Sequence, residues 1–345
     1  MSIIRRLFFA SLAPIVAGGV DPGLGRPARA ATPAHDLYLC TNLSAQSAAV
    51  MGRGGPARSG LYRSSDRTTF THLGPHHIRL FQVATDPREP GTLFVAALDG
   101  MLRTRDGGRS WRILTSWDMT EPKAFAFDPQ APDHVYAGLP DGIAVSRDRG
   151  QTWQRMHAGI RRAYTNALAV DRTQAGRVLA GTELGLYLTE DGARTWRLVQ
   201  PTAKVTYDLR QSPHDPRHFL AATSADGVLW SEDRGATWRR LPGVGTDHTL
   251  HNAVFDPTDA RRLALCGWGA GVQVSEDGGR TFVDRTAGLP RREVWSVAAD
   301  PDFPNRLYAA PYLEDLFVSD DFGRTWRPVG FAKATLYAIA FLPRP

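Results

Sequence analysis

The chain has 345 residues, of which 33 are glycine and 24 are proline. This composition favours many short strands and tight turns over long helices. The formal net charge is +6, but half of it comes from the first 30 residues, which hold four arginines and one aspartate. Because no run of more than two basic residues occurs in the rest of the chain, its composition gives nucleic-acid binding little support.

Residues 1–30 are typical of an export signal. Arg5 and Arg6 precede an apolar stretch over residues 7–20, and the segment ends in Ala-Arg-Ala, a small-x-small cleavage site. The arginine pair also resembles a twin-arginine signal, although the usual Ser or Thr does not precede it. We therefore predict an exported protein, periplasmic or secreted by the Sec or twin-arginine route, with no membrane span in the mature chain.

Short apolar strands alternate with turns over residues 31–345. Three strands, at 37–40, 60–63 and 70–73, come first. A repeating frame of four strands then follows, in which the first strand of each repeat ends in Asp-Pro or a related pair. These first strands are expected to begin near Ile78, Lys123, Thr165, Val205, Leu250, Val294 and Leu336.

One motif, Ser/Thr-x-Asp-x-Gly-x-Ser/Thr-aromatic, marks the turn between the third and fourth strand of each repeat. The Asp carboxylate can accept N–H groups of the following residues, the glycine supplies a positive φ, and the aromatic adds buried area. Successive aspartates lie 40 to 44 residues apart, and the first copy is degenerate. We predict a structural role for all seven: Asp66, Asp106, Asp148, Asp191, Asp233, Asp277 and Asp321.

Four antiparallel strands in each repeat of about 43 residues are typical of a propeller blade. The sequence therefore predicts an all-β fold, a single seven-bladed β-propeller domain over residues 31–345. The seventh first strand, at 337–342, ends the chain, so the three N-terminal strands should complete its blade and close the ring. Cys40 and Cys266 occupy equivalent positions in blades seven and five, too far apart for a disulfide, and should be free and buried.

The repeats resemble the BNR, or Asp-box, repeats of sialidases, xyloglucanase-type glycoside hydrolases, sortilin-like receptor domains and photosystem-assembly propellers. This resemblance covers nearly all of the mature chain. It implies the propeller fold and a functional face opposite the Asp boxes, but it does not choose among enzyme, receptor and assembly factor.

Alignment of the first strands on their Asp-Pro endings singles out the fourth repeat. Three residues before the proline, Arg210 stands where the other repeats have small apolar residues, and Asp208 lies on the same strand face as a ready ion-pair partner. Around them we predict a ligand-binding group from neighbouring strands and turns: Tyr207, Arg210, His248, His251, Asn252, Trp268, Trp295 and Tyr312.

Such a group suits a glycan or a protein partner, so we favour a non-catalytic, monomeric recognition or assembly module without metal or cofactor. The alternative is a glycoside hydrolase or polysaccharide lyase that uses Asp208 with Glu293 or Asp226 as acid and base. In a third interpretation Asp208 and Arg210 only neutralise each other inside a water-filled channel. The long loop at 43–59 is either a lid or an insertion without a role.

Overall fold

The structure is a computed structural model that describes residues 33–43, 59–75 and 79–344. The predicted export signal and most of the loop at 43–59 lie outside the described residues. All regular elements in the described part are β-strands, and no helix there could span a membrane. The all-β fold predicted from the sequence is confirmed.

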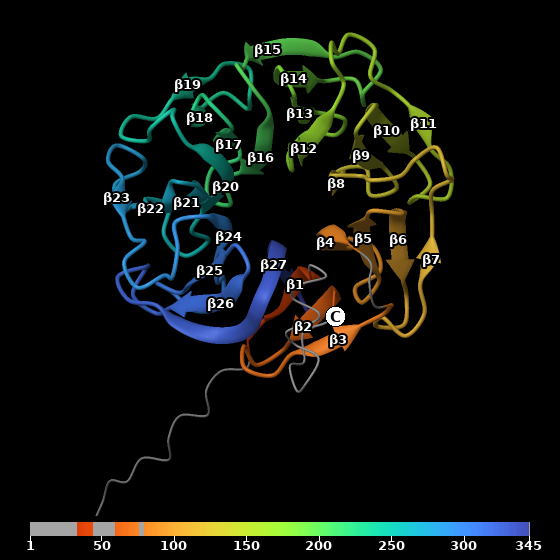
Figure 1. Ribbon diagram of the computed structural model, residues 1–345. Coiled ribbons are helices and arrows are strands. Elements are labelled where there is room, and N and C mark those ends of the chain that lie inside the picture. Colours follow the sequence, from red (N-terminus) through yellow and green to blue (C-terminus); the bar gives the residue numbers. More distant parts are fainter. Residues whose placement is uncertain (1–32, 44–58, 76–78, 345) are drawn as a thin grey trace, which may run out of the picture. The chain divides into compact units, whose positions relative to one another are not determined.

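Five sheets of the described chain share one antiparallel pattern of four strands, ordered from the inside outward in Figure 1. The first two are β4 (Leu80–Thr85), β5 (Leu93–Ala97), β6 (Gly100–Thr104) and β7 (Arg112–Ile113), then β8 (Ala124–Phe127), β9 (Val135–Leu139), β10 (Gly142–Ser146) and β11 (Gln154–Arg155). The third is β12 (Thr165–Val170), β13 (Val178–Thr182), β14 (Gly185–Thr189) and β15 (Arg197–Pro201). The last two are β16 (Thr206–Gln211), β17 (Phe219–Thr223), β18 (Val228–Ser231) and β19 (Arg239–Arg240), then β20 (Thr249–Phe255), β21 (Leu263–Trp268), β22 (Gly271–Ser275) and β23 (Val283–Asp284).

A sixth sheet of seven strands joins the two ends of the described chain. Its order is β24 (Val294–Ala299), β25 (Leu307–Pro311), β26 (Glu314–Ser319), β27 (Arg327–Pro343), β1 (His35–Leu43), β2 (Gly60–Ser64) and β3 (Thr71–Leu73). The long strand β27 pairs with β26 through its first part and with β1 through its second part. The C-terminal strand therefore pairs with the N-terminal strand, as the sequence predicted.

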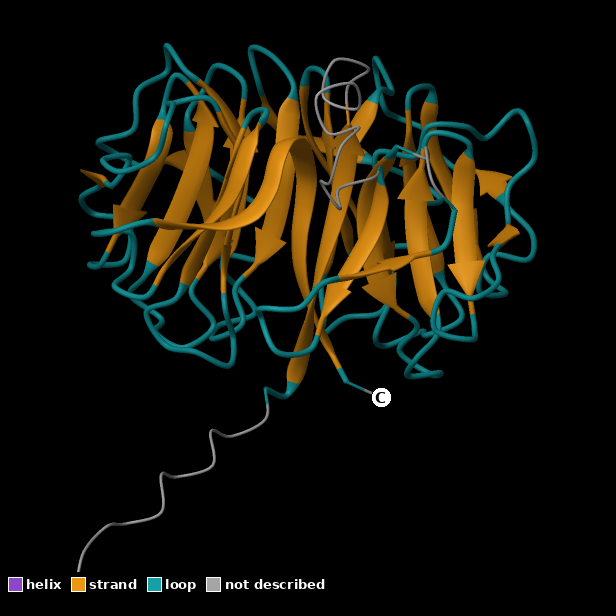
Figure 2. Cartoon of the chain, turned by 60° about the horizontal axis from the view of Figure 1, so that its bottom comes forward, coloured by secondary structure: helices purple, strands orange, loops and turns teal. Residues whose placement is uncertain are grey.

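The sheets stand around a central axis (Figure 1), and their strands run between two faces lined by loops (Figure 2). Each innermost strand contacts the next one in the order β4, β8, β12, β16, β20, β24 and β27, and β27 contacts β4 again. Apolar side chains fill the space between neighbouring sheets. For example, Tyr136 of β9 and Tyr187 of β14 belong to one buried cluster. This burial of apolar area holds the sheets together.

The turn at Asp233 shows how a clear Asp box is built. The Ser231 hydroxyl donates to the Asp233 carboxylate (2.8 Å) and accepts from the Gly235 N–H (2.8 Å). Thr237 donates to the same carboxylate through its N–H (2.8 Å) and its hydroxyl (2.6 Å). The boxes at Asp106, Asp148, Asp191, Asp277 and Asp321 repeat these bonds. Because each carboxylate is satisfied within its own turn, the geometry favours the structural role predicted for these residues.

Arg67 in the degenerate box ties the terminal strands to the segment that follows β24. Its side chain is only 3% exposed and binds Asp300 through Nε (2.8 Å) and Asp302 through Nη2 (3.0 Å). It also donates to the carbonyl of His35 at the start of β1 (2.8 Å). A buried guanidinium with this many acceptors is well compensated, so the incomplete box is supported by an ion-pair network.

Cys40 and Cys266 are both buried and unpaired, as the sequence predicted. Burial raises the pKa of the Cys40 thiol to about 12, because the charged thiolate is disfavoured away from water. Neither thiol has the exposure or the lowered pKa of a reactive cysteine. The two cysteines therefore act as small residues of the core.

Candidate functional site

A β-bulge near the start of the innermost strands shapes the candidate site. In the pairing of β16 with β17, for instance, the register passes from Thr206 to Asp208 and leaves Tyr207 unpaired. A bulge redirects side chains, so two consecutive residues can face the same side of a strand. The bulged residues in six of the described innermost strands are Phe81, Asn166, Tyr207, His251, Trp295 and Tyr337.

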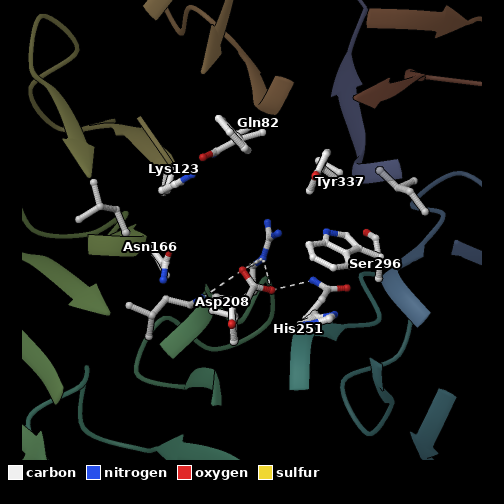
Figure 3. Close-up of a pocket in the computed structure, with 18 of the residues that line it drawn as sticks. Gln82, Lys123, Asn166, Asp208, His251, Ser296 and Tyr337 are labelled. Carbon is white, nitrogen blue, oxygen red and sulfur yellow. Dashed lines mark hydrogen bonds and ion pairs between the residues drawn. The ribbon is translucent and has the colours of Figure 1, made fainter. Parts of the chain in front are cut away.

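A cavity of about 320 Å³ occupies the central channel beside these bulges. Both the bulged residue and the one after it line the cavity in each of those six strands, and Lys123 with Ala124 does so in the remaining one. Figure 3 shows the labelled side chains arranged around this central space. The Asp boxes lie at the opposite end of the innermost strands, where Arg149 of one box contacts Asp86 just after β4 (3.4 Å). The cavity is thus on the face predicted to be functional.

Asp208 is held by donors from its own strand and from the next sheet. Arg210 Nε lies 2.9 Å from one carboxylate oxygen, while the Asn252 amide (2.7 Å) and the Ala253 N–H (3.3 Å) bind the other. Asn252 in turn accepts the N–H of Val297 on β24 (2.9 Å). The ion pair predicted for Asp208 and Arg210 is present, and the same carboxylate links β16 to β20.

Gln82 makes an equivalent link between two other sheets. Its amide donates to the carbonyl of Phe125 and accepts the Phe125 N–H, both at 2.9 Å. Gln82, Asp208 and Asn252 occupy the same position of their strands. These three polar side chains therefore bind the next innermost strand, which compensates for their position in the channel wall.

His251 lies at the centre of an aromatic group beside the cavity. Its ring centroid is 5.2 Å from that of Tyr207, 4.4 Å from that of Trp295 and 5.9 Å from that of Trp268. Burial lowers the pKa of His251 to about 4, against a smaller opposing effect of a hydrogen bond with the Val294 backbone. His251 is therefore neutral near pH 7 and contributes an aromatic surface rather than a charge.

Trp268 and Tyr312 extend the aromatic group outward, with ring centroids 5.1 Å apart. Trp268 ends β21 and Tyr312 follows β25, and neither lines the cavity itself. The structure thus brings together Tyr207, Arg210, His251, Asn252 and Trp295 around the cavity and places Trp268 and Tyr312 beside them.

The other predicted site residues lie outside the cavity lining. His248 is 3.7 Å from Asp247, and the carbonyl of Glu293 accepts the N–H of Tyr312. Asp226 accepts the N–H of Ala203 (2.8 Å) in a surface turn. Among the described residues that line the cavity, Asp208 is the one carboxylate. The arrangement therefore offers Asp208 no second carboxylate across the cavity.

Several cavity residues were not selected from the sequence, among them Arg79, Lys123, Tyr164 and Asn166. Lys123 pairs with Glu121 (2.8 Å) and lies 4.3 Å from the ring centre of Phe81. No hydrogen bond of the Asn166 side chain is recorded within the described residues, so its amide is available to a ligand. Lys123 and Asn166 occupy the same aligned position as Tyr207 and His251, and this shared position was the signal that could have found them.

The Asp-box turns and the antiparallel four-stranded sheets around a channel define a β-propeller of BNR-type repeats. Residues 75–344 match the family model described as photosynthesis system II assembly factor YCF48, and the chain belongs to this family. No curated protein matches the sequence. Among the described residues, no group of three or more potential ligands could hold a metal ion.

Solved structures with a similar fold include enzymes and a family member. YCF48 bound to D1 peptide is 21% identical, with a TM-score of 0.59 over 76% of this chain and 85% of that one. An ancestral GH74 enzyme is 15% identical, with a TM-score of 0.61 over 76% of this chain and 38% of its own. The GH74 xyloglucanase of Xanthomonas campestris is 19% identical, with a TM-score of 0.60 over 72% of this chain and 45% of its own. This chain thus spans less than half the length of the two GH74 proteins.

Proposed function

We propose that the chain is a seven-bladed, closed propeller that binds a segment of a protein partner at the central cavity and catalyses no reaction. The seven-stranded sheet divides into two blades at β27, which serves as the outer strand of one blade and the inner strand of the other. With the five four-stranded sheets this makes seven blades. The unbroken series of contacts between innermost strands supports closure of the ring.

The observation that supports a binding function is that the Asp208 carboxylate is already occupied by hydrogen-bond donors. A glycoside hydrolase needs two carboxyl groups that flank the scissile bond. Here the one carboxylate in the described cavity lining is already bound by Arg210, Asn252 and the Ala253 N–H. A carboxylate held in this way is suited to bracing the channel wall rather than to transferring a proton.

The remaining polar groups of the cavity suit a polypeptide. Asn166 offers both a donor and an acceptor, and Tyr164 and Tyr207 offer hydroxyls. Arg210 binds Asp208 through Nε, which leaves its two terminal nitrogens to donate to a ligand. An extended chain segment presents N–H and C=O groups that such side chains can bind. The complex of YCF48 with D1 peptide supports a peptide as the class of ligand in this family.

A glycan is the second candidate, because aromatic rings lie exposed beside the cavity. Tyr207 is 37% exposed and Trp268 is 41% exposed, and both belong to the group around His251. Flat aromatic surfaces with nearby polar groups are also suited to sugar rings. The N-terminal sequence supports export of the protein, which would place either ligand in the periplasm or outside the cell.

Binding of peptide and glycan arrays to the purified protein tests this proposal, with a reducing-sugar release assay alongside. We expect saturable binding of peptides, reduced about tenfold or more by Tyr207→Ala because about 1.4 kcal/mol of lost contact suffices. Leu198→Ala is the matched control, since Leu198 is exposed on β15, the strand of its sheet that lies farthest from the channel. Saturable glycan binding without peptide binding would favour the second candidate, and release of sugar would contradict a non-catalytic function.

A further inference from the structure

One of the turns on the cavity face carries a tryptophan that is almost fully exposed to solvent. Trp117, in the connection between β7 and β8, is 90% exposed. A tryptophan is a large apolar side chain that proteins usually bury at least in part, so such exposure needs an explanation.

The turn that carries Trp117 is well anchored on both sides. The Met119 N–H donates to the Ser116 carbonyl (2.9 Å), and the buried Met119 side chain packs in a cluster with Leu139. The Thr115 hydroxyl accepts the N–H of Met101 (3.2 Å). Arg155 donates to the carbonyl of Asp118 (2.7 Å) from the next sheet. Trp117 is therefore presented on a braced turn.

Two other blades contain a turn closed by the same hydrogen bond, with a glycine at positive φ (Gly159 and Gly288) where this turn has Asp118. The Ile160 N–H donates to the His157 carbonyl and the Leu289 N–H donates to the Thr286 carbonyl, as Met119 does to Ser116. The first of the two central residues in these turns is an exposed alanine, at 158 and 287. Since alanine is sufficient there, construction of the turn does not require Trp117.

A second exposed apolar residue lies on the adjacent turn. Leu98, between β5 and β6, is 39% exposed, and its carbonyl accepts the N–H of Glu121, which follows the Trp117 turn (2.8 Å). The same two turns approach closely at Gly100, where an added Cβ would meet the Thr115 hydroxyl. Trp117 and Leu98 thus lie on two turns that contact each other, and we call these two residues the Trp117 knob.

Carboxylates outnumber cations around the knob, although Arg155 also acts on Asp118 and the Arg79 carbonyl accepts the Leu98 N–H. Four carboxylates stand on the turns that carry or contact it, and two of these are paired with cations: Glu121 with Lys123 (2.8 Å) and Asp141 with Arg155 (2.5 Å). For the other two, Asp99 and Asp118, no ion pair is recorded within the described residues. Hydrogen bonding by the Ser116 hydroxyl lowers the pKa of Asp118, so this carboxylate is charged at neutral pH.

From this exposure, anchoring and charge we infer that the Trp117 knob binds a partner protein at an apolar pocket rimmed by lysine or arginine side chains. Tryptophan is among the residues that contribute most to protein interfaces, and a charge of opposite sign on the partner would orient its approach. The acidic surroundings disfavour an anionic membrane surface, which attracts basic residues instead. This interaction is separate from peptide binding in the channel, since neither Trp117 nor Leu98 lines the cavity.

Panning of a phage-displayed peptide library on the purified protein tests the inference. We expect one class of enriched peptides to combine apolar with basic residues and to lose at least tenfold in affinity on Trp117→Ala. Leu184→Ala is the control and should change nothing, because Leu184 lies on the hairpin turn between β13 and β14 of another blade and is about as exposed (41%) as Leu98 (39%). Neutralisation of Asp99 and Asp118 to Asn should weaken the same peptides and reduce the salt dependence of their binding.

Folding and the channel site are controlled within the same experiment. Because the equivalent turns carry alanine, Trp117→Ala should keep the wild-type melting temperature, and Leu98→Ala provides a second variant of the knob. Peptides that respond to Tyr207→Ala but not to Trp117→Ala belong to the channel. If all enriched peptides fall in that class, the inference is overturned, whereas the proposed function survives.

Two further measurements distinguish other partners of the knob. Binding to phosphatidylcholine vesicles, with or without phosphatidylglycerol, should be absent, and sedimentation should show no dimer that depends on Trp117. Vesicle binding or dimer formation that Trp117→Ala abolishes would overturn the inference in favour of a membrane or of a second copy of the chain.

Discussion

The Asp-box turns and the wall of the central channel lie at opposite ends of the repeats and use their aspartates differently. At Asp233 the carboxylate is bound by Ser231 and Thr237 of its own turn, and the other clear boxes repeat the arrangement. At Asp208 the carboxylate is bound partly by Asn252 of the next sheet, and no other blade has an acid at that position. The turns that build the framework are alike in the blades, whereas the candidate site contains residues that differ between blades at equivalent positions.

The channel wall itself contains two kinds of polar residue. Gln82, Asp208 and Asn252 are engaged with the backbone or side chains of the next innermost strand, whereas no partner of the Asn166 side chain is recorded among the described residues. Divergence alone therefore does not identify a ligand contact. A residue must also retain hydrogen-bonding capacity that the fold does not use.

Removal of the C-terminal strand should produce the largest effect. Deletion of residues 337–345 removes the part of β27 that pairs with β1 and contacts β4. Loss of a whole innermost strand should exceed the roughly 5–15 kcal/mol that stabilises a typical domain, so we expect an insoluble or unfolded product. Deletion of residues 1–30 is the control and should leave a folded protein. A soluble, cooperatively melting protein without residues 337–345 would contradict closure of the ring by the terminal strands.

Acid should affect His251 first, because its pKa is lowered from 6.5 to about 4, and the Asp boxes at lower pH, where most of the stability should be lost. Partial burial acts to raise the pKa of Asp191, but hydrogen bonds from Thr195 and Thr189 outweigh it and lower this pKa to about 2. The pKa of Asp321 is about 2 for the same reasons. A lowered folded-state pKa stabilises the fold above the unfolded pKa of about 3.9, and this stability is lost as the pH falls toward 2.

The measurement is the melting temperature between pH 7 and pH 2. We expect it to fall mainly below about pH 4, because the boxes share the lowered pKa. Asp191→Asn should show a shallower dependence than the wild type in that range. A melting temperature that fell mainly between pH 7 and pH 5 would contradict this origin of the acid sensitivity.

The repeat spacing was sufficient to predict most of the fold. Regular recurrence of the box located the four strands of each repeat, and the chain's end at a lone first strand predicted that β27 pairs with β1. Alignment of the first strands also placed Tyr207 and His251 side by side, as their ring contact confirms. These features follow from local turn chemistry and the period of the pattern, both of which are visible in a single sequence.

The bulge could not be predicted in the same way. Five of its six residues are aromatic and one is an asparagine, and an aromatic residue near the start of a strand does not by itself indicate an irregular pairing. The sequence aligned Lys123 and Asn166 with Tyr207 and His251, but only the structure shows that the residues at this position line the cavity. The directions of side chains in surface turns were equally hidden, so His248 and Glu293 were grouped with the cavity but lie outside its lining.

Paired substitutions at Asp233 and Asp208 test the difference between framework and site directly. Asp233→Ala leaves the Thr237 N–H without its acceptor, and Asp208→Ala leaves Arg210 and the Asn252 amide without theirs. Each should lower the free energy of unfolding by about 1–3 kcal/mol, measured by urea denaturation. Peptide affinity should fall only for Asp208→Ala. Equal affinity loss in both variants would show that the effect spreads through the fold and would remove the distinction.

The smallest effect on stability is expected at Asn166, where substitution should weaken ligand binding instead. Asn166 and Gln82 carry the same amide group in the same channel, but Gln82 exchanges two hydrogen bonds with Phe125, whereas none is recorded for the Asn166 side chain within the described residues. Gln82→Ala should therefore lower the melting temperature, while Asn166→Ala should change the free energy of unfolding by less than about 0.5 kcal/mol.

For peptide affinity we expect the opposite order, with a larger effect of Asn166→Ala than of Gln82→Ala. Loss of one ligand hydrogen bond is worth about 0.5–1.5 kcal/mol, so Asn166→Ala should weaken the affinity by roughly threefold to tenfold, as measured by calorimetry. Gln82→Ala should have a smaller effect, since its amide is already occupied by the neighbouring strand. If Asn166→Ala lowered stability as much as Gln82→Ala and left affinity unchanged, then spare hydrogen-bonding capacity would not identify ligand contacts here, because both amides would belong to the framework.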